Sequence, residues 1–274
     1  MDETRNLKEK ILNEYPRLGE GDRFTFACHP GVSCFTRCCA DVNIVLSPVD
    51  VLRMKRVLGI SSRAFLDRYT VTIGTAQTQL PVVLLKMNDD GSKACPFVGE
   101  GGCRIYEARP WPCRMYPLGL ASPSEDNPTL AAPFYFLMRE EVCRGFLESG
   151  ATERTVREWI DDQGVAAYNR AGEAWKEIAL HRFFTGGGHL GPDAMDMLFL
   201  AAYDLDRFRA FVFGSSFLRK FVVEPETVAA MEKDDEALLA FAMRWLKFAL
   251  FQEPTMRIRE EVAGAYRKAT GQER

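Results

Sequence analysis

Cysteine placement constrains this chain more than any other feature of its sequence. There are eight cysteines, and none follows residue 143. They are Cys28, Cys34, Cys38, Cys39, Cys95, Cys103, Cys113 and Cys143. Four fall in a loop-like stretch, residues 28–40, in which Pro30 and Gly31 prevent regular structure. Three more fall in a second irregular stretch, residues 94–120. Thiols gathered in irregular loops favour metal binding, because cysteine thiolates are ligands of zinc and of iron–sulfur clusters.

Disulfide bonds and inert buried thiols are the two alternatives. A chain of 274 residues does not need disulfides to fold, and the polar N-terminus, with no apolar signal segment, predicts a reducing, cytoplasmic location. Free cysteines pack as small hydrophobic residues, which accounts for one or two but not for the adjacent pair Cys38–Cys39 in a polar loop. Metal binding is therefore the preferred interpretation.

Charge and hydropathy exclude two classes of partner. The net charge of −3 provides no basic surface for nucleic acid, so no nucleic-acid partner is expected. No run of about 18 apolar residues is present, so no membrane partner is expected either.

Cysteine spacing does not identify the metal. The intervals Cys28-x5-Cys34-x3-Cys38-Cys39 and Cys95-x7-Cys103-x9-Cys113 match neither paired zinc knuckles nor the ferredoxin pattern. The adjacent pair cannot easily chelate one ion, since successive side chains of an extended backbone point to opposite faces. The pair either reaches one polynuclear cluster through a turn or serves two neighbouring sites.

Charged and imidazole side chains beside the cysteines are secondary candidates. Arg37, Arg104, Arg109 and Arg114 are placed to offset thiolate charge, or are ordinary surface arginines. His29 adjoins Cys28 and is either a ligand or an exposed loop residue.

Hydrophobic periodicity predicts an α+β fold. Strands are expected at residues 23–27, 42–47, 71–75, 80–87 and 131–138. A helix is expected from Pro48 to Leu58, capped by Ser47 and ended by Gly59, and another helix begins after Ser61 or Ser62. Residues 5–15 and the four long segments after residue 151 have helical periodicity. The predicted organisation is an irregular cysteine-rich α+β domain at residues 20–150 and an α-helical region at residues 151–274.

The ordered motifs resemble a known family. CHPGVSCFTRCC, then LSPVDVLRMKRVLGIS, then CPFVGEGGCRIYEARPWPCRMYPLGL are similar to the YkgJ-type cysteine-cluster family, described as zinc- or iron-chelating. The resemblance covers residues 24–147 and implies that the first seven cysteines are ligands, with Cys143 as the eighth. It also implies supporting roles for Tyr106, Arg109, Pro110, Arg114 and Tyr116. The first motif departs from the family's C-x2-C-x2-C-C in its two longer intervals.

Three functions follow from these observations. The preferred one is a metal-binding protein that holds an iron–sulfur cluster, [4Fe–4S] before other types, or zinc, and serves electron transfer or metal handling. The second is a protein-modifying enzyme, since flagellin lysine N-methylases carry a related cysteine cluster and use S-adenosylmethionine. The third is a zinc-stabilised interaction module, with the helical region as a protein-binding or homodimer surface. No Ser/His/Asp triad can be assembled from the sequence, and enzyme activity is left undecided.

Overall fold

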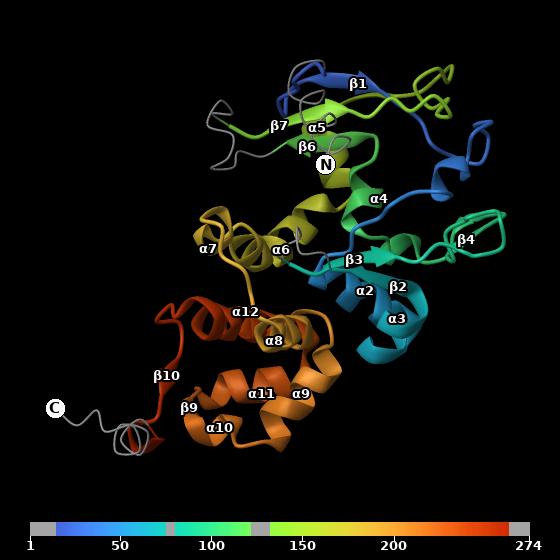
Figure 1. Ribbon diagram of the computed structural model, residues 1–274. Coiled ribbons are helices and arrows are strands. Elements are labelled where there is room, and N and C mark those ends of the chain that lie inside the picture. Colours follow the sequence, from blue (N-terminus) through green and yellow to red (C-terminus); the bar gives the residue numbers. More distant parts are fainter. Residues whose placement is uncertain (1–14, 75–79, 122–131, 263–274) are drawn as a thin grey trace. The chain divides into compact units, whose positions relative to one another are not determined.

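The computed structural model describes residues 15–74, 80–121 and 132–262 (Figure 1). The described residues form two compact units, and each unit combines two separate stretches of chain. Unit 1 lies within Met1–Leu46 and Leu84–Arg170, and unit 2 lies within Ser47–Val83 and Ala171–Arg274. Because both units are discontinuous, they do not test the domain boundaries predicted from the sequence, and these stay a prediction.

Short antiparallel strand pairs build unit 1. β1 (Arg23–Thr25) pairs with β8 (Glu153–Thr155), and β4 (Val98–Gly99) pairs with β5 (Gly102–Cys103). β6 (Leu118–Ala121) lies beside β7 (Phe134–Leu137) in Figure 1, with Leu118 opposite Leu137. The remaining elements are η1 (Arg37–Cys39), η2 (Tyr106–Ala108), α4 (Trp111–Met115), α5 (Val156–Asp162) and the start of α6 (Val165–Ala179).

An aromatic core holds these short elements together. The Phe26 ring lies 5.6 Å from the Trp159 ring and 5.0 Å from the Phe146 ring, centre to centre. Phe24 also packs edge-on against Trp159, at 5.8 Å. The buried members of this core are Phe24, Phe26, Met115, Leu118, Val156, Trp159, Ile160 and Val165. Large aromatic side chains bury enough surface to fix strands of three or four residues.

Helices form most of unit 2. They are α2 (Pro48–Leu58), α3 (Ser62–Tyr69), the end of α6, α7 (Arg182–Thr185), α8 (Pro192–Ala202), α9 (Leu205–Gly214), α10 (Phe217–Lys220), α11 (Pro225–Lys233) and α12 (Asp235–Phe251). Its strands are β2 (Thr70–Ile73), which pairs with β3 (Val82–Leu85), and β9 (Phe221–Val222), which pairs with β10 (Arg257–Ile258). β3 ends in unit 1.

The predicted helix signals act as expected. The Ser47 side chain accepts from the backbone N–H of Asp50, and the Asp50 carboxylate accepts from that of Ser47. Gly59 ends α2 in the left-handed conformation, at φ 63°, which glycine adopts without steric cost. Ser61 caps α3. The α+β class is confirmed by these helices and the small antiparallel pairs.

One expected strand is absent. Residues 42–47 form only an isolated bridge between Val45 and Leu84, because Asp41 takes a left-handed turn and Ser47 already begins the cap of α2. The last predicted helix, residues 254–270, starts later than expected, since Arg257–Ile258 form strand β10; residues 260–262 are helical, and the rest of this segment lies outside the described residues. The helix expected at residues 5–15 falls outside the described residues but for Tyr15.

A buried lysine organises the polar contacts of unit 2. The Lys55 side chain is 7% exposed, and its ammonium lies 3.1 Å from Asp206 Oδ1 and 3.0 Å from Asp235 Oδ2. The backbone N–H of Ser62 donates to Asp206, and Ser62 Oγ accepts from the backbone N–H of Asp206, so α3 and α9 cap each other. Burial opposes ionisation of Asp206, but the hydrogen bonds from Ser62 and Lys55 outweigh it and lower the pKa of this carboxyl.

We predict that Asp206→Asn lowers the free energy of unfolding at pH 7 by about 1 kcal/mol, since this carboxylate is partly exposed and screened by solvent. The pKa of Asp206 is lower in the folded state than in the unfolded state. Its carboxylate therefore stabilises the fold at pH values above the unfolded pKa of about 3.9, and this stabilisation is lost as the pH falls through the folded pKa. Urea unfolding at pH 7 and at low pH measures the difference in the free energy of unfolding. Asp67→Asn, which removes an exposed pair with Arg63, is the control. An equal loss at both pH values would contradict the prediction.

Candidate metal centre

The first cysteine loop is a succession of tight turns. The backbone N–H of Phe35 donates to the Val32 carbonyl at 2.9 Å, and that of Arg37 donates to the Cys34 carbonyl at 2.9 Å. Thr36 takes a left-handed conformation, at φ 67°, and starts the short helix η1. These turns fold the loop back on itself, so that Cys34 and Cys38 come close to the chain that enters at Cys28.

A second segment closes this loop from the other side. The backbone N–H of Ala27 donates to the Gly145 carbonyl at 3.0 Å, which sets residues 26–28 beside residues 143–145. The backbone N–H of Arg144 donates to the Cys34 sulfur at 3.1 Å. Cys143 thereby reaches the first loop, although more than a hundred residues separate it from Cys34 in sequence.

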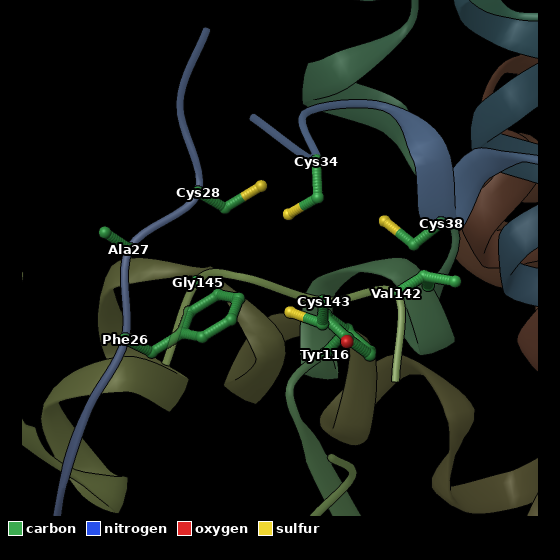
Figure 2. A pocket seen from close by; sticks show the side chains of 9 residues that line it. All are labelled: Phe26, Ala27, Cys28, Cys34, Cys38, Tyr116, Val142, Cys143 and Gly145. Carbon is green, nitrogen blue, oxygen red and sulfur yellow. The ribbon is translucent and has the colours of Figure 1, made fainter. Parts of the chain in front are cut away.

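Four cysteines line one small cavity, as Figure 2 shows. We call Cys28, Cys34, Cys38 and Cys143 the pocket cysteines. Their sulfurs face a common space, and Tyr116, Phe26 and Gly145 line the same cavity. The cavity measures about 10 Å³, which is close to the smallest space that holds one water molecule. An ion fits such a space better than an organic molecule does.

The other four cysteines are gathered by a different contact. Cys95 donates its backbone N–H to the Cys39 carbonyl at 2.7 Å, and Ala40 forms an antiparallel bridge with Ala94. The Lys93 ammonium also lies 3.0 Å from an Asp41 carboxylate oxygen. Residues 39–41 and 93–95 therefore run side by side, which places Cys39 next to Cys95. We call Cys39, Cys95, Cys103 and Cys113 the hairpin cysteines.

The β4–β5 hairpin returns Cys103 toward Cys95. Cys103 pairs with Val98, and the backbone N–H of Val98 donates to the Cys95 carbonyl at 3.1 Å. Gly102 has φ 106°, and a Cβ at this position would lie 3.0 Å from the Phe35 ring. The hairpin therefore needs glycine both for its turn and for its close approach to the first cysteine loop.

Cys113 is held by its neighbour Arg114, which is 7% exposed. Arg114 Nε donates to the Arg109 carbonyl at 3.0 Å and Nη1 to the Gln163 carbonyl at 2.7 Å, while Nη2 donates to the Glu107 carbonyl. Its guanidinium also lies 4.4 Å from the centre of the Tyr168 ring. Three carbonyls bound by one planar cation fix the short helix α4, which carries Cys113.

Thiol pKa values at the cavity reflect burial and crowding. Burial, followed by the charges of Cys38, Cys34 and Cys143, raises the pKa of Cys28 to about 11. The Cys39 thiol donates to Cys38 and lowers the pKa of Cys38 to about 7, against the opposing effect of burial. Burial and crowding therefore keep the Cys28 thiol protonated, and a bound cation would favour its thiolate instead.

The hairpin cysteines show the same crowding. The pKa of Cys39 is raised mainly by the hydrogen bond from its thiol to Cys38. Burial contributes next, followed by the charges of Cys38, Cys113 and Cys95. Burial also raises the pKa of Cys95, while the backbone N–H groups of Phe97 and Val98 and the charge of Arg104 favour its thiolate. These directions place Cys113 within electrostatic reach of Cys39, and Cys103 within reach of Cys95.

The donor set fits a thiolate-bound metal. All eight cysteines are free thiols. The Tyr116 hydroxyl is buried and lies beside the Cys143 thiol (Figure 2). Burial and Cys143 raise its pKa, so it stays a neutral donor for a thiolate sulfur. No three His, Cys, Asp or Glu side chains within the described part of the chain converge closely enough to bind an ion as they stand, so side chains must turn toward the metal.

The structure clarifies the secondary candidates. Arg109 donates to the Tyr106 carbonyl at 2.7 Å and to Gln163, so Arg109 and Arg114 organise the backbone around Cys113. Arg104 lies near Cys95 and offsets thiolate charge, as predicted, whereas Arg37 is exposed. His29 Nδ1 accepts from the backbone N–H of Gly31 at 3.1 Å and does not line the cavity. That any cysteine is a ligand stays a prediction.

Two pocket residues could not be recognised from sequence. Phe26 and Gly145 lie far apart in the chain, and only the Ala27–Gly145 contact brings them together. A glycine two residues after Cys143 is the one available signal, because a Cβ at Gly145 would lie 2.4 Å from the Ala27 carbonyl oxygen and 2.5 Å from the Phe26 ring.

We predict that Gly145→Ala pushes the Cys143 segment away from Cys28, lowering the free energy of unfolding by about 1–3 kcal/mol and reducing bound metal. Gly101→Ala is the control, since a Cβ there meets no atom within 4 Å. Thermal unfolding and elemental analysis measure both effects. Full metal content and unchanged stability in Gly145→Ala would refute the assigned contact.

We also predict that Arg114→Lys lowers the free energy of unfolding by about 2 kcal/mol, because one ammonium group cannot replace three fixed donors to buried carbonyls. Arg37→Lys, at an exposed position, should change it by less than about 0.5 kcal/mol. Urea unfolding of the protein as purified compares the two. Equal effects of both substitutions would show that Arg114 does not anchor α4.

Comparison with known families agrees with this geometry. Residues 27–146 match a family model described as "CxxCxxCC: Putative zinc- or iron-chelating domain". No curated protein and no solved structure matches the chain. The matched range contains all eight cysteines and every residue that lines the cysteine cavity except Phe26. Residues 27–146 are therefore similar to the CxxCxxCC zinc- or iron-chelating domain, which agrees with the resemblance to YkgJ-type proteins seen in the sequence.

Proposed function

We propose that this chain is a metal-binding protein whose cysteine thiolates hold iron, preferably as a [4Fe–4S] cluster, or zinc. The observation that carries the proposal is the convergence of four cysteines from two segments far apart in sequence on one cavity. Four thiolates are the complete ligand set both of a structural zinc ion and of a [4Fe–4S] cluster. The family description supports chelation of zinc or iron.

Electron transfer or metal handling, without a substrate of its own, is the role that we propose for the site. A bound cluster would supply one-electron chemistry, whereas zinc would supply structural stability. The cysteine cavity of about 10 Å³ is far smaller than the roughly 300–1,000 Å³ of clefts that hold small-molecule substrates. This small size favours the site of a single ion over the active site of a methylase.

A cytoplasmic location is part of the proposal, because eight free thiols persist in a reducing compartment. Among the described residues, no helix combines the length and hydrophobicity needed to cross a bilayer.

Anaerobic purification followed by elemental analysis and a visible spectrum tests the proposal. We expect bound iron with broad visible absorption that reduction bleaches, or bound zinc without colour. Apo-protein prepared with a chelator should lose much of the order of residues 28–40 and 94–115, since metal binding is coupled to folding. Protein that contains neither metal after anaerobic handling and reconstitution would overturn the proposal.

Binding of labelled S-adenosylmethionine is measured on the same preparation. We expect no binding, because the described cysteine cavity has no room for this molecule. Saturable binding would favour the methylase alternative.

A further inference from the structure

We propose that the eight cysteines form two separate four-thiolate sites: the pocket cysteines (Cys28, Cys34, Cys38 and Cys143) at one and the hairpin cysteines (Cys39, Cys95, Cys103 and Cys113) at the other. This inference rests on the proposed function and adds the number of sites and the ligand set of each. Neither the family description nor the sequence spacing assigns such a division.

The adjacent pair marks the division. Cys38 and Cys39 lie in the 3₁₀ turn η1, and the Cys39 thiol donates to the Cys38 sulfur, so this pair lies where the two groups of cysteines meet. Cys38 lines the cavity with Cys28, Cys34 and Cys143, whereas Cys39 does not. The carbonyl of Cys39 instead accepts from the backbone N–H of Cys95, at the start of the other group.

Each group has its own backbone framework. The Ala27–Gly145 hydrogen bond and the N–H of Arg144 on the Cys34 sulfur hold the pocket group. The pairing of residues 39–41 with 93–95 and the β4–β5 hairpin hold Cys39, Cys95 and Cys103, while the Arg114 hydrogen bonds fix α4, which carries Cys113.

Ligand stoichiometry supports the same division. A zinc ion takes four thiolates in tetrahedral geometry, and a [4Fe–4S] cluster also takes four cysteines. Eight thiolates exceed the capacity of either single centre but fill two. On binding, each thiol releases its proton to solvent as its sulfur bonds to the metal, which leaves about two negative charges at each four-thiolate zinc site. Donors lie beside both groups: Tyr116 and the Arg144 N–H at the pocket cysteines, and Arg104 at the hairpin cysteines.

Metal counting in matched variants tests the division. Cys34→Ser removes one pocket ligand and Cys103→Ser removes one hairpin ligand, while Ser33→Ala is an exposed control beside Cys34. The wild type and the control should bind about two zinc ions, or about two clusters, per chain. Each cysteine variant should retain about half of that metal, and the double variant should retain none.

Alkylation followed by mass spectrometry identifies which thiols remain protected. In zinc-loaded Cys34→Ser, the reagent should modify Cys28, Cys38 and Cys143 while the hairpin cysteines stay protected. Cys103→Ser should give the reciprocal pattern. Loss of all metal from both single variants, with their secondary structure retained, would show one merged site and overturn the division.

Cobalt titration of the metal-free wild type decides the question if a variant fails to fold. Thiolate-to-cobalt absorption should rise until about two equivalents are added, and a plateau at one equivalent would overturn the two-site inference while leaving the proposed function intact. A wild-type protein that takes up no cobalt, zinc or iron would instead refute the proposed function itself.

Discussion

Hydrogen bonds between backbone segments that are distant in sequence gather the thiols of this protein. Residues 39–41 run beside residues 93–95, and Ala27 bonds to Gly145, so these contacts set Cys39 beside Cys95 and Cys143 beside the first cysteine loop. Neither contact belongs to a large sheet, and the strands around them are only two to four residues long. The aromatic core beneath, centred on Phe26 and Trp159, supplies the burial that such short strands cannot supply.

Burial and crowding keep several of these thiols protonated in the absence of a cation. Burial and neighbouring thiolates raise the pKa of Cys28, and similar effects act on Cys39 and Cys95. A bound metal ion would favour the thiolate over the thiol, because the metal binds the deprotonated sulfur and offsets the negative charges of the ligands. Backbone N–H groups and the Tyr116 hydroxyl are placed to stabilise the same thiolates. The positions of the cysteines and the electrostatics around them therefore both favour metal chelation.

Local signals in the sequence predicted much of the fold. The Ser47–Asp50 capping box, the glycine that ends α2 and the cap at Ser61 depend on neighbouring residues, and all are confirmed. The expected strand at residues 42–47 is absent because of a turn at Asp41 and the cap of α2 at Ser47, and the helix expected after Pro254 starts only at residue 260 because Arg257–Ile258 pair with Phe221–Val222. Gly164, at φ 65°, divides one predicted helical segment into α5 and α6.

The sequence by itself determined the chemistry: eight thiols in irregular loops, their family, and the arginines placed beside them. Only the tertiary structure decided which thiols face each other, since the groups combine residues up to 115 positions apart through hydrogen bonds that leave no local pattern. It also decided that Cys38 lines the cysteine cavity and Cys39 does not, although their two thiols are hydrogen-bonded to each other. A metal site depends on the distances between its ligand atoms in space. The number of residues between two cysteines does not give that distance.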